Sequence, residues 1–272
     1  MLSIKSLSIN LTRRISNYLR FLFQEKKKER DGIITGFGKI GGRKVFVYAQ
    51  DFTFMGASMG ETQTRKVAHV IELAMKTGAP VIGLLDSGGA RIQEGIDGLD
   101  GGGEIFRNNT LASGVVPQIS AIMGPCAGGA VYSPGITDFV AMVKDTSNMF
   151  ITGPDVIKTV TGEEVTKEDL GGPEVHMAKS GVATHIGEDD ESTLSWVMKL
   201  LTYIPPNNVE TAPVMPTAGK GGIESIPLEE LVPSNPNKSY DMHDVISQLI
   251  DAHSFLELQP DYASNIIIGF SR

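Results

Sequence analysis

Cysteines, long apolar runs and nucleotide-binding motifs are scarce or missing in this sequence of 272 residues. A single cysteine, Cys126, excludes an internal disulfide and is typical of a reducing compartment. No run of about 18 apolar residues occurs, so we expect no membrane-spanning helix. The P-loop signature is also missing, so we do not expect ATP to bind in that way.

Metal-binding motifs are missing as well. The sequence has five histidines, and none of them follows the HxH or HExxH spacing of a metal site. These are His69, His176, His185, His243 and His253. We therefore predict no metal site in this chain.

Charge is unevenly distributed around a net of −8. Residues 1–30 carry eight Lys or Arg against two Glu, a net of +6, and the remainder carries 16 against 30, a net of −14. An acidic body argues against nucleic-acid binding. Residues 1–24 contain arginines and serines but no acid, so they resemble a mitochondrial targeting peptide; the alternative is an irregular start. We expect a cytoplasmic protein, or a mitochondrial matrix protein if the segment is a targeting peptide.

Hydrophobic periodicity predicts an α/β fold with a mostly parallel sheet. Strands at 33–40 and 43–50 form a hairpin around a Gly-Gly turn, and a helix follows at 60–77. Buried strands are predicted at 80–85 and 117–123, a second helix at about 103–113, and a third helix after residue 128. Short strands follow near 141–143 and 148–151.

The last third of the chain changes in composition. A helix predicted at 194–203 ends at two prolines, and residues 205–238 are rich in Pro, Gly, Asn and Ser, which is typical of a linker. A helix at 241–251 and a strand at 266–270 are predicted after it. This tail is too small to form a core alone, so we expect it to pack on the preceding domain or on a partner.

The segment 124–134 (GPCAGGAVYSP) is the most informative in the chain. It lies between a buried strand and a run of small residues that can open a helix. Paired glycines at such a junction, Gly128 and Gly129, leave consecutive backbone N–H groups uncovered beside the positive end of a helix. This arrangement predicts an oxyanion hole built from backbone groups. Tight packing of the helix against the strand is the structural alternative.

A second glycine cluster, 86–95 (DSGGARIQEG), follows the other buried strand, so the pattern of strand, glycine turn and helix occurs twice. Ser87 does not lie in the Gly-x-Ser-x-Gly elbow of serine hydrolases. Cys126 has no histidine nearby in the sequence, which disfavours a nucleophilic role. The pattern therefore favours chemistry at a carbonyl without a side-chain nucleophile.

These segments, together with 48–53 (YAQDFT), 78–80, 150–154 and 265–270 (NIIIGF), closely resemble the carboxyltransferase (beta) subunits of biotin-dependent acyl-CoA carboxylases. The propionyl-CoA carboxylase group is the nearest. The resemblance runs from about residue 25 to 272 and implies a crotonase-like (ClpP/crotonase) β-β-α superhelix. It implies a carboxyltransferase N-terminal domain at 25–204 and the start of a truncated C-terminal domain at 239–272.

The resemblance also implies roles for the glycine clusters. The N–H groups of Gly128 and Gly129 would hold the enolate of an acyl-CoA thioester during carboxyl transfer. Gly88, Gly89 and Ala90 would let the pantetheine arm of coenzyme A run against backbone.

For Arg91 two readings stay open. It would pair with a CoA phosphate, or it would form a structural ion pair with Glu94 or Asp86. Nearby, the segment 97–103 (DGLDGGG) departs from the family pattern and is expected to add negative charge and flexibility beside the presumed CoA channel.

The partners implied by the resemblance are a biotin carboxylase or biotin carboxyl carrier subunit, which delivers carboxybiotin, and further copies of the chain in a hexamer. Two alternatives belong to the same resemblance: the alpha subunit of a biotin-dependent methylmalonyl-CoA decarboxylase, or a non-catalytic CoA-binding fragment. A crotonase-type hydratase or isomerase would need a positioned Asp or Glu base, for which the sequence shows no clear candidate.

Overall fold

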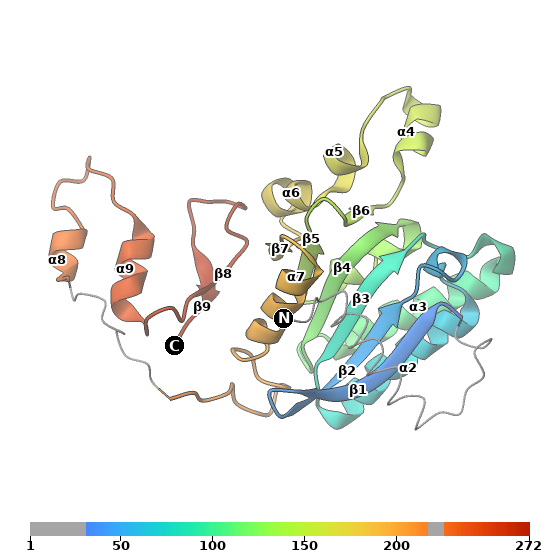
Figure 1. Ribbon diagram of the computed structural model, residues 1–272, viewed down its shortest axis with the longest axis horizontal. Coiled ribbons are helices and arrows are strands. Elements are labelled where there is room, and N and C mark those ends of the chain that lie inside the picture. The colour runs from blue at the N-terminus through green and yellow to red at the C-terminus, as the bar shows by residue number, and fades with distance from the viewer. Residues whose placement is uncertain (1–30, 217–225) are drawn as a thin grey trace.

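A computed structural model of the chain describes residues 31–216 and 226–272. Residues 1–24, for which a targeting peptide was considered, lie outside the described residues. The main element is a seven-stranded sheet in the order β1-β2-β3-β4-β5-β7, with β6 also paired to β4 (Figure 1). The first pair is antiparallel and the others are parallel. This confirms the predicted α/β class.

The strands follow the buried runs of the sequence. Their bounds are β1 Ile33–Ile40, β2 Arg43–Gln50, β3 Val81–Ser87, β4 Gln118–Ala127, β5 Phe139–Val143, β6 Asn148–Phe150, β7 His185–Gly187, β8 Leu256–Leu258 and β9 Ile268–Phe270. The α-helices are α2 Glu61–Thr77, α3 Ile96–Ala112, α4 Pro154–Thr161, α5 Lys167–Gly171, α6 Pro173–Val175, α7 Asp190–Leu200, α8 Leu228–Leu231 and α9 Met242–Leu249. The short turns are η1 Met55–Ala57, η2 Ile92–Glu94, η3 Gly128–Val131, η4 Pro134–Ile136 and η5 His176–Ser180.

Helices cover both faces of the sheet, because alternate residues of each strand are apolar on either side. On one face, α2 and α3 pack over β2, β3 and β4, and Ile71 of α2 is fully buried there. On the other face, α7 places Trp196 and Leu200 against Ile82 and Ile119. The sheet is thus a central layer whose strand ends are fixed from both sides.

The β1–β2 hairpin forms as predicted. Ile40 pairs with Arg43, and the two intervening glycines, Gly41 and Gly42, have φ of 56° and 80°. Two consecutive positive φ angles are the requirement of a type I′ turn, which glycine meets without strain.

The start of α3 was predicted wrongly. The helix begins at Ile96, so the glycine-rich segment 97–103 is helical and is not the flexible stretch that its composition indicated. A Cβ at Gly101 would overlap Thr64 of α2, and one at Gly98 would lie 3.2 Å from the Met59 carbonyl. Close contact with α2 therefore outweighs the low helix propensity of glycine.

The end of β4 also differs from the prediction. The strand does not stop at residue 123 but continues to Ala127, and two short 3₁₀ turns, η3 and η4, stand where a third helix was expected. The reason lies in pairing. β5 occupies the first half of β4 and β6 the second half, so the backbone of 125–127 remains in the sheet.

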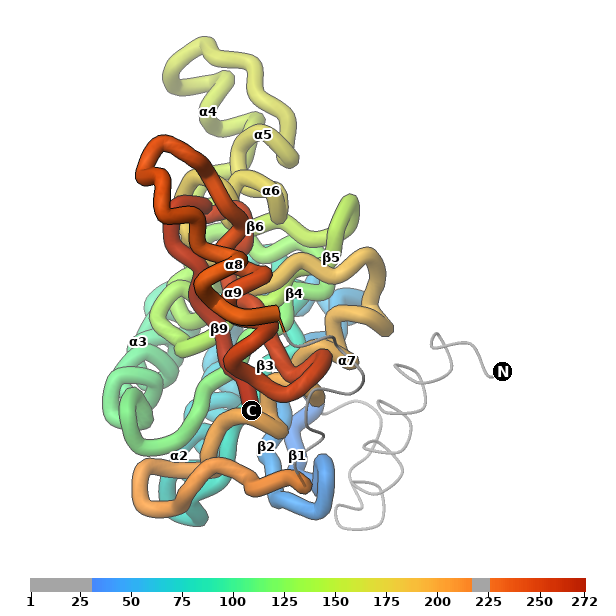
Figure 2. Tube along the Cα trace, turned by 90° about the vertical axis from the view of Figure 1, so that its left-hand side faces the viewer, coloured from blue at the N-terminus to red at the C-terminus, as the bar shows by residue number. Residues whose placement is uncertain are grey.

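Residues 239–272 pack against the main sheet and α7 through their own two-stranded sheet, β8 and β9 (Figure 2). Leu256 joins the apolar cluster around α7, and Phe139 of β5 contacts Phe270 of β9. Arg272 donates to the Thr202 carbonyl at 2.9 Å and lies over the ring of Tyr203. The predicted helix at 241–251 and strand at 266–270 appear as α9 and β9.

The contact between α2 and α3 generates a prediction with a matched control. Gly101→Ala should destabilise the protein by about 1–3 kcal/mol, because the new methyl group has no space beside Thr64. Gly103→Ala in the same helix meets no atom within 4 Å and should stabilise by about 0.5–1 kcal/mol through helix propensity. Urea unfolding measures both, and equal effects of the two substitutions would contradict the packing argument.

Candidate functional site

The two glycine clusters meet in space. They lie at the carboxyl ends of β3 and β4, which are neighbouring parallel strands, and are therefore close together at the same end of the sheet. Gly89 has φ of +102°, and a Cβ there would lie 2.8 Å from the Ala127 carbonyl oxygen. Glycine is therefore required at position 89 for two reasons: other residues rarely adopt this backbone conformation, and a side chain would clash with the Ala127 carbonyl.

The predicted oxyanion turn lies at the start of η3. Gly128 has φ of +56°, and it is followed by Gly129 as the second residue of the turn. Amides at the first positions of a helical turn have no carbonyl one turn earlier to receive them, and no side chain caps this turn. Oxyanion holes are built from uncapped amides of this kind, and this role of Gly128 and Gly129 stays a prediction.

The space that a side chain at Gly129 would occupy is open. A Cβ at Gly129 would meet nothing within 4 Å, and one at Gly128 would lie 3.8 Å from the Ile151 carbonyl oxygen. Tight packing, the structural alternative, therefore does not explain Gly129. Tyr132, half exposed and in edge-on contact with Phe106 of α3, lies at the end of the same turn.

The Cys126 side chain is hydrogen-bonded to the turn. Its thiol is fully buried and donates to the Ala130 carbonyl at 3.3 Å. Burial, with the nearby Asp86 charge, raises the pKa of the thiol to about 12. A thiol in that environment stays protonated near neutral pH and lacks the thiolate that a nucleophile needs.

The amides of the first glycine cluster are already used. The Gly88 N–H donates to the Gly56 carbonyl at 2.9 Å, and the Gly89 N–H donates to the Ser87 hydroxyl at 3.2 Å. Ser87 is fully buried and donates to the Ala57 carbonyl, which is a structural arrangement. The cluster therefore offers backbone surface without free amides at Gly88 and Gly89, and their predicted contact with pantetheine stays a prediction, as does that of Ala90.

Arg91 lies in a buried ion-pair network. Its Nη1 is 2.5 Å from Asp31 and 2.7 Å from Glu94, and its Nη2 donates to the Ser58 carbonyl at 2.8 Å. Of the two partners considered from the sequence, the structure shows Glu94 and adds Asp31 in place of Asp86. This geometry favours the structural role, and binding of a CoA phosphate by Arg91 stays a prediction.

The same network caps α2. Asp31 accepts from the Gln63 N–H at 2.9 Å and Glu94 accepts from the Glu61 N–H at 2.7 Å, both in the first turn of the helix. Hydrogen bonds to the Glu61 amide and to Arg91 lower the pKa of Glu94. Sequence reasoning missed Asp31 because it lies 60 residues from Arg91 and outside any motif.

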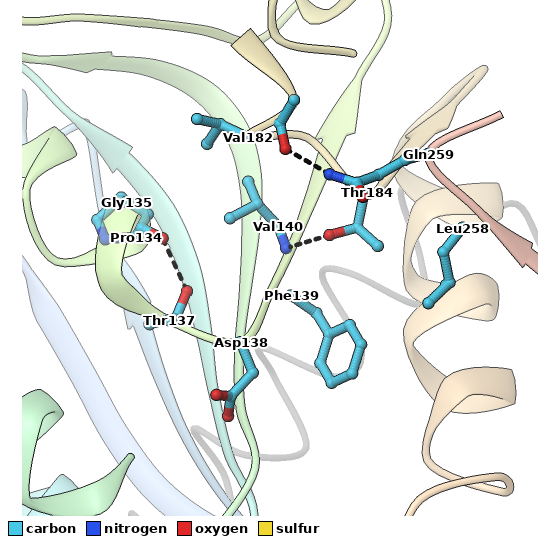
Figure 3. A pocket seen from close by; sticks show the side chains of 11 residues that line it. Pro134, Gly135, Thr137, Asp138, Phe139, Val140, Val182, Thr184, Leu258 and Gln259 are labelled. Carbon is cyan, nitrogen blue, oxygen red and sulfur yellow. Dashed lines mark hydrogen bonds between the residues drawn. The ribbon is translucent and has the colours of Figure 1, made fainter. Parts of the chain in front are cut away.

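A cavity of about 270 Å³ lies elsewhere, between β5 and the tail (Figure 3). Phe139, Val140, Thr184, Leu258 and Gln259 are among its lining residues, and the Gln259 side chain donates to the Gly181 carbonyl. None of the predicted site residues lines it. This cavity is therefore a consequence of tail packing and is separate from the glycine turns.

The described ranges, 31–216 and 226–272, contain no group of three His, Cys, Asp or Glu side chains placed to hold a metal ion. Nor does any helix in that part of the chain have the length and apolarity to cross a membrane.

A glycine turn without a side-chain cap, set beside a second glycine turn, is the arrangement that the sequence resemblance implied. The protein-family model of the carboxyl transferase domain matches residues 12–272 of this chain. The chain belongs to this family. The match covers both glycine turns and the tail, so the predicted resemblance is confirmed.

Relatives are similar over nearly the whole chain. The carboxyltransferase subunit of propionyl-CoA carboxylase from Haloferax mediterranei is 56% identical over 253 residues, which cover 93% of this chain and 49% of that protein. The methylmalonyl-CoA decarboxylase subunit alpha from Veillonella parvula is 54% identical over 252 residues, 92% of this chain and 50% of that protein. The chain thus spans about half the length of these relatives.

A solved structure of transcarboxylase 12S has the same fold. It superposes with a TM-score of 0.84 at 49% identity and covers 89% of this chain and 48% of that one. That protein is described as a hexamer assembly with hydrolysed methylmalonyl-coenzyme A bound. The similarity confirms the predicted crotonase-like fold of the family. The domain division predicted at residues 205–238 stays a prediction.

The environment of Cys126 predicts its reactivity. A thiol-specific disulfide reagent at pH 8 should leave the native protein unlabelled, because the thiol is buried and protonated. One equivalent should react after unfolding in guanidinium. Complete labelling of the native protein within minutes would show that Cys126 is accessible and would reopen its role as a nucleophile.

Proposed function

We propose that this chain provides the acyl-CoA half of a carboxyltransferase, which adds a carboxyl group to the α-carbon of propionyl-CoA or acetyl-CoA. The observation that carries the proposal is the turn at Gly128 and Gly129, which has no side-chain cap and where a Cβ at Gly129 would meet no atom within 4 Å. The family and the similarity to the propionyl-CoA carboxylase subunit support the substrate class.

The turn suits one step of this reaction. Loss of the α-proton turns the thioester into an enolate whose negative charge lies on the thioester oxygen. The Gly128 and Gly129 amides would donate to this oxygen, and each such donor contributes about 2.7–4 kcal/mol in well-studied enzymes. The enolate carbon then forms the new C–C bond to the carboxyl group.

The turn itself carries no side-chain base or nucleophile. Ser87 and Cys126 are buried and hydrogen-bonded to backbone carbonyls. Biotin, carried by a partner protein as carboxybiotin, would supply the carboxyl group and take the α-proton on its ring nitrogen. The residues of this chain would then bind the thioester, orient it and stabilise its oxyanion.

Exposed apolar side chains support an oligomeric assembly. Ile92, Ile96 and Leu99 follow the first glycine turn and are 88%, 79% and 63% exposed. Neighbouring exposed apolar residues mark protein contacts more often than free surface. We propose that copies of the chain, and a biotin-carrying subunit, cover this side in the working complex.

A second candidate is the alpha subunit of a methylmalonyl-CoA decarboxylase. The similarity to the Veillonella parvula subunit supports it, and decarboxylation passes through the same thioester enolate in the opposite direction. The non-catalytic alternative is a fragment that binds CoA thioesters without turnover. Measurements of binding and of turnover distinguish these candidates.

Binding should depend on the open space at Gly129. Isothermal titration of propionyl-CoA into the chain should give saturable binding, which Gly129→Trp abolishes by filling the space in front of the turn. Gly38→Trp, at an exposed position of β1 with no atom within 4 Å, is the matched control and should bind like the parent. A folded parent chain that does not bind propionyl-CoA would overturn the proposal.

Chemistry can be tested without a biotin partner. Release of CO2 from methylmalonyl-CoA generates the enolate and requires only stabilisation of its oxyanion. The chain should accelerate this release, and Gly129→Trp should abolish the acceleration, because its side chain fills the space that the thioester needs. Binding without any acceleration would favour the non-catalytic alternative.

A further inference from the structure

A chain of buried polar side chains crosses the face of the sheet that α2 and α3 cover, and it reaches the residue that follows the glycine turn. Its members are Tyr48 of β2, Asn109 of α3, Gln118 of β4 and Ser133, which lies between η3 and η4. None of the four is more than 6% exposed. Buried polar groups are costly unless they are hydrogen-bonded, so the partners of these side chains fix their orientations.

The direction of each hydrogen bond follows from one backbone carbonyl. The Asn109 carbonyl can only accept, so Gln118 Nε2 donates to it at 3.0 Å and Gln118 Oε1 is left as an acceptor. Asn109 Nδ2 donates to that oxygen at 2.8 Å. Asn109 Oδ1 is then left to accept from the Ser133 hydroxyl at 2.9 Å. The Asn109 amide therefore makes all of these bonds in a single orientation.

Tyr48 joins the chain from the other side. It pairs with Gly83 of β3, and a Cβ at that glycine would lie 2.5 Å from the Tyr48 hydroxyl oxygen, so the ring occupies the space where a side chain of β3 would stand. The Tyr48 hydroxyl is hydrogen-bonded to Ser133, and burial raises the pKa of Tyr48 to about 12. Because Ser133 gives its own proton to Asn109, Tyr48 is the donor in this bond.

Ser133 connects two short turns that their own backbone holds weakly. η3 has four residues, and the Tyr132 N–H reaches the Gly129 carbonyl at 3.5 Å, which is long for a hydrogen bond. η4 follows with three residues. Since 3₁₀ turns have poor hydrogen-bond geometry, their position depends on side-chain contacts. Cys126 supplies such a contact before the turn and Ser133 supplies one after it.

We propose that Asn109 is a positioning residue, which through Ser133 holds the Gly128–Gly129 turn in the orientation that binds the thioester oxyanion. The bonds to Ser133 come from β2 and α3, which are fixed in the core, so they tie the turn to the rigid part of the fold. Asn109 is only 1% exposed, and it acts through the turn without touching the substrate. Its effect on chemistry rests on the proposed function.

The position of the turn can be observed without any substrate. Ser133→Ala removes the donor to Asn109, so the backbone amide signals of Gly128 and Gly129 in ¹H–¹⁵N NMR should shift and their hydrogen exchange should become faster. A folded Ser133→Ala protein in which both amides exchange as slowly as in the parent would overturn the proposal, whatever its stability.

A second substitution acts from a different element. Asn109→Asp keeps the shape of the side chain but places an acceptor against Gln118 Oε1, so it should also speed exchange at Gly128 and Gly129. Asn108→Asp is the matched control: it is the same substitution at the next position of α3, and it breaks a bond to the Ala68 carbonyl of α2. Equal exchange rates at the two glycines in both variants would show a general loss of stability and would contradict positioning by Asn109.

The effect on chemistry has its own measurement. Release of CO2 from methylmalonyl-CoA should be slower by about tenfold or more in Asn109→Asp, whereas propionyl-CoA affinity should change by less than about threefold, since oxyanion contacts are strongest in the transition state. Asn108→Asp should keep the parent rate. Faster exchange at the turn with an unchanged rate would overturn the positioning role. A parent chain that binds no propionyl-CoA, but whose turn responds to Ser133→Ala and Asn109→Asp, would overturn the proposed function alone.

Discussion

The contact between the two glycine turns is the constraint on which the rest of the site depends. A Cβ at Gly89 would lie 2.8 Å from the Ala127 carbonyl oxygen, and Gly128, the next residue after Ala127, has a positive φ that favours glycine. The turns are fixed relative to one another because β3 and β4 are adjacent strands in a sheet covered on both faces. A binding surface made of backbone is therefore as rigid as the sheet beneath it.

Ion pairs extend this rigidity to the helical layer. Arg91 follows the first turn directly, and its partners Asp31 and Glu94 also receive the first amides of α2. One guanidinium thus connects the start of β1, the glycine loop and the N-terminus of a helix. Removing one partner of such a buried group leaves the others uncompensated, so the loop and the helix depend on each other.

Local patterns predicted the parts of the fold that are decided locally. The hairpin at Gly41 and Gly42, the amphipathic helix α2 and the buried strand β3 each carry their signal within a short window. The position of a glycine turn after β4 was predictable for the same reason, and its role as an oxyanion hole stays a prediction. The helical state of 97–103 was not predictable in this way, because it depends on Thr64 of a different helix. The Asp31–Arg91 pair and the orientation of Asp86 over Gly124 likewise arise only when distant strands come together.

Two strands, β5 and β6, pair with different halves of the same side of β4, and this has a consequence for the segment that follows β6. β5 takes residues 119–122 and β6 takes 125–127, so the chain leaving β6 starts beside the oxyanion turn, with the Ile151 carbonyl next to Gly128. From there it runs out through α4, a helix without a single buried residue, and returns where Gly171 touches the Met149 carbonyl (Figure 1). The segment 151–171 is therefore an exposed extension that is anchored next to β6 at both of its ends. A protein docked on this exposed arm would therefore contact a segment that begins beside Gly128.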